Sequence, residues 1–240
     1  MDGKGTKARI ISGIALKSLF NLAVLKLTAV YFGTTGIALL AHLQNLTGII
    51  IHLGREGVSR SLCTIIQRRQ LSHPHRQSLI ISGLLFSLLL QLVSLLIIVI
   101  FRKYFLQHFP LEISYLTFFL IYGMAVMLFG LCVYFSAIIF GLGRLKYYFF
   151  INTAGALLIV VALLIGIDRN GLMYYLFAYV VGQSLNFLVI LPFILKFGLL
   201  KLGKASISFH SMREVSGFFL MAISVLFLAR LLILWSGIMP

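Results

Sequence analysis

The sequence predicts an all-α polytopic membrane protein with about seven transmembrane helices. Three observations predict this fold class. Hydrophobic residues make up 61% of the 240 residues and the mean hydropathy is +1.08, whereas soluble domains contain about 45–50% apolar residues. The apolar residues fall into long runs, close to the roughly 20 residues that a helix needs to cross the hydrocarbon core. These runs lack the period of two that a transmembrane β-barrel requires.

Seven apolar segments follow one another, and each is expected to be a helix because a helix satisfies its own backbone hydrogen bonds inside lipid. We expect the second segment to continue as helix to Ile66, and Pro192 lies late in the sixth, where a proline can kink a helix. In chain order the segments are Ile10–Phe32, Gly36–Leu53, Ser78–Phe101, Ile113–Phe140, Tyr147–Ile167, Leu172–Phe197 and Ser216–Ser236.

Basic residues gather in alternate connections between these segments. The N-terminal tail and the connections after the second, fourth and sixth segments hold most of them, whereas the other connections hold only Arg102, Lys103 and Arg169. By the positive-inside rule, this pattern places the N-terminus in the cytoplasm. The same bias accounts for the net charge of +15. Nucleic acid is excluded as a partner, since the chain has no basic stripe interleaved with exposed aromatic residues.

The sequence lacks the usual parts of an enzyme active site. The five acidic residues lie in connections or at segment ends, so no carboxylate pair is expected within a span for acid–base or metal chemistry. Cys63 and Cys132 are too few for a disulfide framework and are interpreted as small buried hydrophobic residues. We therefore expect no enzymatic activity, no metal and no cofactor. The acidic residues are Asp2, Glu56, Glu112, Asp168 and Glu214.

Basic residues also lie in or beside the apolar segments, at Lys17, Lys26, Arg55 and Arg230. A cationic cavity suits an anionic cargo such as a phosphate or pyrophosphate group. Lys17 and Lys26 differ by nine positions, which places them on opposite faces of a helix and about 13 Å apart in depth. Lys17 leans toward the nearer interface and either snorkels to it or lines a cavity. Lys26 leans toward the bilayer centre, where a wet cavity or an anionic partner would offset its cost.

Amide and imidazole side chains accompany these cations. Asn21 lies one turn after Lys17, and the second segment contains the run HLQNLTG with Gln44 and Asn45. These polar groups either bridge helices or face a sugar-binding cavity, where amides suit hydroxyl groups. His42 and His52 are about 80° apart on a helical wheel, and they either line the same cavity or lie at the membrane interface.

Over nearly its whole length, and most specifically in its first 60 residues, the chain resembles the O-antigen flippases of the polysaccharide transporter family, within the superfamily that includes multidrug and toxin extrusion proteins and lipid II flippases. The resemblance lies in a first helix with two basic residues, Lys17 and Lys26, a short FGTTG turn, and a second helix with Gln44 and Asn45. Looser matches follow at GLGR (141–144), KFGLLKLGKAS (196–206) and HSMREVSGFFLMAIS (210–224).

The resemblance implies a multi-pass protein of the bacterial inner membrane with two six-helix lobes around a central cavity. Residues 1–205 would form the N-terminal lobe, and residues 206–240 the linker and the seventh helix, which starts a second lobe. The cargo would be an undecaprenyl-pyrophosphate-linked oligosaccharide, such as an O-antigen unit, moved by alternating access. The expected substrate-binding residues are Lys17, Asn21, Lys26, Gln44, Asn45, Arg55 and Arg230.

By this resemblance we expect the chain to be the N-terminal lobe plus one helix, as either a truncated gene product or a fragment. We expect it to work with a second lobe, a second copy of itself or proteins of polysaccharide assembly, among membrane lipids. A lone lobe would otherwise expose cavity-lining polar groups to lipid. Other readings are a related exporter of small solutes or drugs, a non-enzymatic membrane subunit of polysaccharide assembly, and a membrane enzyme of that assembly. The scarcity of acidic residues argues against a cation exporter, and the short outer connections argue against the enzyme.

Overall fold

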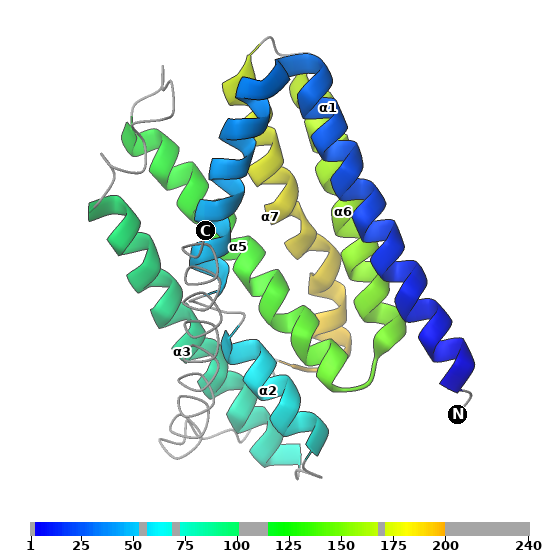
Figure 1. Cartoon of the computed structure of the whole chain (residues 1–240). Helices are drawn as coiled ribbons and strands as arrows, with labels where there is room; N and C mark the ends of the chain where they lie inside the picture. The colour runs from blue at the N-terminus through cyan, green and yellow to red at the C-terminus, as the bar shows by residue number, and fades with distance from the viewer. Residues whose placement is uncertain (1–2, 53–56, 69–72, 101–114, 168–170, 200–240) are drawn as a thin grey trace, which may run out of the picture.

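The computed structural model describes residues 3–52, 57–68, 73–100, 115–167 and 171–199. All regular structure in these ranges is helical, as predicted, and Figure 1 shows the arrangement. Five helices are long and apolar enough to cross a membrane, which agrees with a multi-pass membrane protein, and α2 is the exception. The helices are α1 (Gly3–Ile51), α2 (Gly57–Arg68), α3 (His73–Ile100), α5 (Tyr115–Gly141), α6 (Leu145–Ile167) and α7 (Leu172–Lys196).

Helix α1 is a hairpin of two arms, which correspond to the first two predicted segments (Figure 1). The break is at Gly33, whose φ of 62° and ψ of −154° lie in a region that only glycine adopts readily. Three residues later, Gly36 is buried, and a Cβ there would meet the Phe32 side chain. The two glycines of the FGTTG turn therefore have different tasks, since Gly33 reverses the chain and Gly36 makes room for the reversal.

The expected continuation of the second segment to Ile66 is wrong, because α1 ends at Ile51 and a separate helix, α2, begins at Gly57. Helix α2 is amphipathic, and its apolar stripe of Val58, Leu62 and Ile65 is buried against α3 and α5. Apolar residues at a spacing of three and four make a helix that packs along one face. Residues 57–66 are therefore helical, but they belong to a separate amphipathic helix.

Helices α6 and α7 form the most closely packed pair. A Cβ on Gly182 of α7 would lie 3.0 Å from both the Ile159 Cα and the Ala162 Cβ of α6. On the other helix, a Cβ on Gly155 would overlap the Asn186 side chain. Small residues at such crossings let two backbones approach closely, which is a principal means of helix association in lipid.

The remaining predicted spans match α3, α5, α6 and α7 to within a few residues at most ends. Helix α7 continues through Pro192 to Lys196. The seventh predicted segment, Ser216–Ser236, and the proposed second domain, 206–240, lie outside the described residues, so the predicted count of seven is not confirmed.

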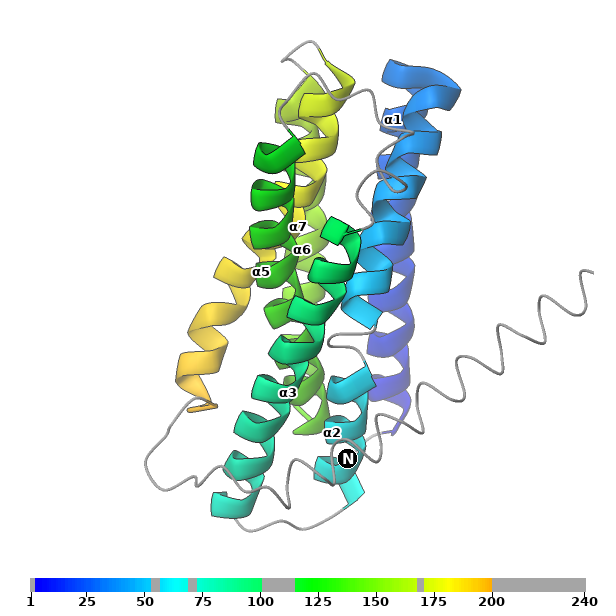
Figure 2. The same ribbon diagram turned by 90° about the vertical axis from the view of Figure 1, so that its left-hand side faces the viewer.

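Basic residues of α2, α3, α6, α7 and the α5–α6 connection collect at one end of the bundle. Both views place α2, the start of α3, the α5–α6 connection and the end of α7 toward the lower end, with the N-terminus (Figures 1 and 2). These elements carry Arg60, Arg76, Arg144, Lys146 and Lys196. The chain therefore brings together in space the connections that the sequence had grouped by charge.

Candidate binding cavity

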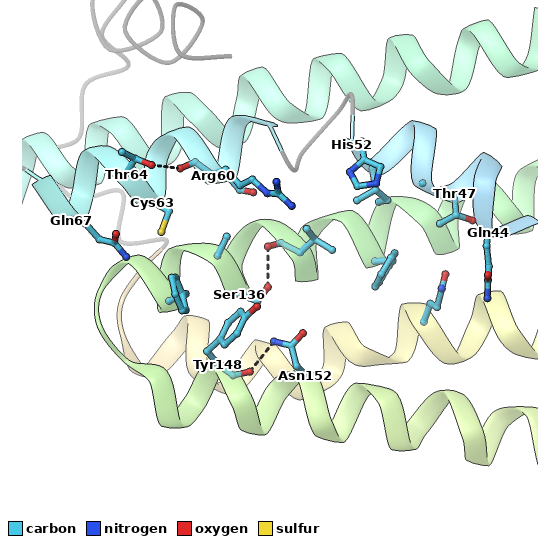
Figure 3. Close-up of a pocket in the computed structure, with 18 of the residues that line it drawn as sticks. Gln44, Thr47, His52, Arg60, Cys63, Thr64, Gln67, Ser136, Tyr148 and Asn152 are labelled. Carbon is cyan, nitrogen blue, oxygen red and sulfur yellow. Dashed lines mark hydrogen bonds between the residues drawn. The ribbon is translucent and has the colours of Figure 1, made fainter. Parts of the chain in front are cut away.

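A cavity of about 770 Å³ lies between the second arm of α1 and helices α2, α5, α6 and α7 (Figure 3). This volume is in the range of small-molecule sites, which are about 300–1,000 Å³. Its apolar lining includes Ile51, Phe129, Val133 and Phe140. Its polar and basic lining consists of Gln44, Thr47, His52, Ser59, Arg60, Thr64, Gln67, Ser136, Tyr148, Asn152, Tyr179 and Gln183.

Helix α2 supplies one wall of this cavity. Its lining residues recur at intervals of one, three or four positions, so they share the face opposite the buried apolar stripe. They are Ser59, Arg60, Cys63, Thr64 and Gln67. The Thr64 hydroxyl donates a 3.0 Å hydrogen bond to the carbonyl oxygen of Arg60, and the Arg60 side chain extends from α2 into the cavity (Figure 3).

The opposite end of the cavity is formed by neutral groups of α1 and α7. Gln44 and Thr47 lie at the far end from Cys63 and Gln67 (Figure 3). The Gln44 Nε2 atom donates a 3.1 Å hydrogen bond to the Tyr179 hydroxyl. The Thr47 hydroxyl donates to the Leu43 carbonyl at 2.9 Å, a bond that uses its single proton.

Helix α7 presents a polar stripe, Tyr175, Tyr179 and Gln183, at intervals of four residues to the α1 hairpin. The Tyr175 hydroxyl lies 2.8 Å from the Thr28 hydroxyl of the first arm. Because Thr28 donates its proton to the Val24 carbonyl, Tyr175 is the donor in this pair. Tyr175 therefore ties α7 to the first arm, as Tyr179 ties it to the second.

Gln183 is the last member of this stripe along α7. Its side chain interacts with the Tyr179 hydroxyl, and the residue is only 7% exposed. Its Oε1 atom is buried and accepts no hydrogen bond from the protein. A buried acceptor without a donor is uncommon and destabilising in native proteins.

A second cavity of about 350 Å³ lies between the first arm of α1 and helices α6 and α7. Its lining includes Phe20, Asn21 and Ile159, together with Gln44 and Tyr179. Gln44 and Tyr179 also line the larger cavity. Their hydrogen-bonded pair is therefore the shared wall between the two spaces.

The predicted site residues are only partly brought together. Asn21 and Gln44 meet at the smaller cavity. Lys26 and Asn45 are exposed, and neither belongs to the lining of these two cavities. Lys26 is about 140° around the helix from Asn21 and thus points elsewhere. Lys17 lies in α1, but its side chain is outside the described part of the chain. Arg55 and Arg230 lie wholly outside the described residues.

Sequence reasoning missed Arg60, Tyr179 and Gln183 as members of a site. Arg60 had been counted only as a basic residue of a connection. The polar spacing across residues 59–67 and the four-residue interval from Tyr175 to Gln183 were the available signals. Each marks a polar face on an otherwise apolar helix.

The described lining of the larger cavity is cationic, because Arg60 is the charged group in it. All five acidic residues of the chain lie outside the described ranges. Arginine offers a planar fork of donors that suits phosphate oxygens, and amide and hydroxyl groups suit neutral polar groups. The cavity can therefore bind a ligand with one anionic and one neutral polar part.

Comparisons with protein-family models, with curated proteins and with solved structures found no match to this chain.

Proposed function

We propose that this chain is a membrane lobe that binds a lipid-linked oligosaccharide and contributes to flipping it across the bacterial inner membrane. The observation that carries the proposal is the 770 Å³ cavity, with Arg60 in its wall and the Gln44–Tyr179 pair at its far end. It lies among helices that are long and apolar enough to cross a membrane. The resemblance of residues 17–49 to O-antigen flippases supports the same cargo.

The two ends of the cavity suit the two chemical parts of such a cargo. The guanidinium of Arg60 would hold the pyrophosphate, while Gln44 and Tyr179 would face the sugar. Because Arg60 lies at the basic end of the bundle, the positive-inside rule places the pyrophosphate near the cytoplasmic surface, with the N-terminus on the same side. Alternating access would then expose the sugar end to the opposite side.

In this proposal, Lys26 and Asn45 contact a partner protein and not the ligand in the cavity. Both are exposed on α1, and a charged side chain facing lipid costs at least about 2.5–3.5 kcal/mol near the bilayer centre. A second lobe or a second copy of the chain against the α1 hairpin would give these side chains a polar surface to face. Lys17, Arg55 and Arg230 would complete the cationic set.

Binding of a fluorescent undecaprenyl-pyrophosphate disaccharide to the purified chain in detergent tests the proposal. We expect saturable binding that Arg60→Gln weakens about tenfold, as expected for a lost charge-assisted contact. Arg144→Gln is the matched control, because Arg144 lies at the same end, is exposed and contacts the Phe197 ring at 5.6 Å instead of the cavity. Equal binding by wild type and Arg60→Gln would contradict the assignment of the pyrophosphate end.

Transport in liposomes tests the need for a partner. The chain alone is expected to bind the lipid-linked disaccharide without flipping it, since one lobe cannot enclose a polar cargo from both sides. Flipping by liposomes that hold single copies of the chain would show that the lobe is sufficient.

A further inference from the structure

The start of α6 and the end of α7 carry two exposed lysines, Lys146 and Lys196, at the basic end of the bundle (Figure 1). The Lys196 ammonium lies 5.3 Å from the centroid of the Tyr147 ring. Contact with a ring face holds an ammonium group in place without neutralising its charge. All five acidic residues of the chain lie outside the described ranges, so no carboxylate of the described residues offsets these two charges.

Aromatic rings lie one turn deeper along both helices. On α6, Lys146, Tyr147 and Phe150 share one face, because Phe150 is four and three positions after the other two. The exposed Phe150 ring packs against the Phe193 ring of α7 at 6.0 Å, and the Tyr147 ring lies 5.3 Å from the same ring. Phe193 is three residues before Lys196. This lysine–aromatic surface therefore has a charged outer layer and an apolar layer beneath it.

The helix ends that carry this surface are fixed by glycine turns. Helix α7 is followed by a turn in which Gly198 has a φ of 61° and Leu199 is buried in the core. In the connection before α6, Gly143 has a φ of 72°, and the Arg144 amide donates a 3.1 Å hydrogen bond to the Ile139 carbonyl oxygen. A left-handed glycine closes a helix and sets the direction of the chain after it. The two lysines are thus held at defined places on the bundle.

We propose that the lysine–aromatic surface binds an anionic phospholipid of the surrounding bilayer, with its phosphate on Lys146 and Lys196 and an acyl chain along Phe150 and Phe193. The order of the two layers matches the order of headgroup and chain in such a lipid. Basic surfaces between helices at the cytoplasmic side of a membrane suit anionic headgroups. None of these residues lines either cavity, so the proposal does not depend on the cargo.

Quenching of a single tryptophan by brominated phospholipid measures lipid binding at one position of the full-length chain. Phe150→Trp in a Trp235→Phe background puts the reporter on the surface, since Trp235 is the one tryptophan of the chain. The protein is reconstituted in brominated phosphatidylcholine with increasing amounts of unlabelled phosphatidylglycerol of the same chain length. We expect phosphatidylglycerol to bind about fivefold more tightly than phosphatidylcholine, as one basic residue near an anionic headgroup would give.

Leu89→Trp in the same background is the positional control, because Leu89 is exposed on α3, away from the start of α6 and the end of α7. It should bind the two lipids equally. Equal binding of the two lipids at Phe150→Trp as well would overturn the proposal.

The lysine variants test which charges hold the headgroup. Lys146→Gln with Lys196→Gln should abolish the preference at Phe150→Trp, and each change alone should reduce it. Arg76→Gln is the matched control, because it removes a positive charge from the same end of the bundle but lies on α3. It should keep the preference. A preference that survives the double change would show only the general attraction of a basic protein for an anionic membrane, and the proposed site would be wrong.

Inorganic phosphate separates a lipid site from a site for a soluble anion. Phosphate added at constant ionic strength should leave the preference unchanged, because the free ion has no chain to lie on Phe150 and Phe193. Loss of the preference would assign the surface to the soluble anion and reject the phospholipid. The substituted side chains of the surface are exposed, so these variants should fold, and circular dichroism of the helices checks this.

Discussion

The Gln44 Nε2 atom donates a 3.1 Å hydrogen bond to the Tyr179 hydroxyl, and this pair forms the wall between the two cavities of the bundle. The two residues are 135 positions apart in the chain. One is on the second arm of α1 and the other is on α7, so the wall is also a cross-link between the hairpin and the α6–α7 pair. Changing either side chain should therefore affect both stability and access to the cavities.

Tyr179→Phe should lower the free energy of unfolding by about 1 kcal/mol, because it removes the hydroxyl that Gln44 needs and keeps the ring. Thermal unfolding in detergent measures the effect. Tyr174→Phe is the control, since Tyr174 is exposed on the same helix and its change should be nearly neutral. If Tyr179→Phe and Tyr174→Phe have the same melting temperature, the Gln44–Tyr179 hydrogen bond does not stabilise the fold.

Gly33→Ala should destabilise the α1 hairpin by about 1–3 kcal/mol, because its backbone angles belong to a region that is costly for other residues. Gly33→Asn should be similarly unfavourable, although asparagine tolerates the ordinary left-handed helical region, since ψ here is −154°. The comparison is with Gly123→Ala in α5, where a Cβ meets nothing within 4 Å and alanine should be neutral or stabilising. Equal unfolding temperatures for Gly33→Ala and Gly123→Ala would contradict this explanation of the turn.

Gly182→Leu should separate α6 from α7 and lower the free energy of unfolding by about 1–3 kcal/mol, the usual range for overpacking. The reason is the 3.0 Å approach of a Cβ at this position to both Ile159 and Ala162. Gly123→Leu introduces the same side chain into open space and serves as the control. If both variants unfold at the same temperature, close packing at Gly182 is not what holds these helices together.

The Cys63 thiol should react slowly at neutral pH, because burial raises its pKa above the ordinary value of 9.0. Only the thiolate attacks an alkylating reagent, so the rate should keep rising with pH beyond 9.0, where an unfolded chain levels off. A raised pKa in the folded state also means that stability from this group is present below the unfolded pKa and is lost as pH rises through the folded value. Iodoacetamide labelling of native and denatured chain across this range checks the shift. A native profile that levels off with the denatured one would show a solvated thiol.

Lys26→Gln should leave the binding of the lipid-linked disaccharide to the isolated chain unchanged, since Lys26 is exposed and outside the lining of both cavities. Within a cell that makes surface polysaccharide, the same change should reduce export if Lys26 faces a partner lobe. Weaker binding of the disaccharide by the isolated chain would place Lys26 in the cavity after all.

Hydropathy was sufficient to find the long helices of the described residues, but it found neither the separate helix α2 nor the cavity. Leu172–Phe197 was predicted from apolarity alone, and α7 ends only one residue earlier, at Lys196. The prediction succeeds because the bilayer sets the length of a span, so each span is a continuous apolar segment of the sequence. The turn at Gly33 was also foreseen, because it lies in the short connection between the first two predicted segments and matches the FGTTG turn of the resemblance. These features depend on one segment at a time.

The cavity depends on several helices at once, which explains what was missed. Gln44 was expected either to bridge helices or to face a cavity, and it does both. Tyr179 and Gln183 are single polar residues in an apolar helix, and only their position opposite α1 gives them a shared surface. Arg60 was missed because it had been counted among the basic residues of a connection, whereas its orientation is set by the packing of Leu62 and Ile65 on the core.

The α6–α7 pairing also dictates an order of assembly during synthesis. These helices are neighbours in sequence, so α7 can dock on α6 as soon as it emerges, and such local contacts form quickly. The first arm of α1 is made earliest, yet Thr28 must wait for Tyr175, which is 147 residues later. Until then the arm has no α7 to bond with, and its polar groups depend on water, lipid headgroups or an insertion chaperone. Thr28 thus waits for 147 residues to be made before its partner on α7 exists, a longer interval than the 135 residues that separate Gln44 from Tyr179.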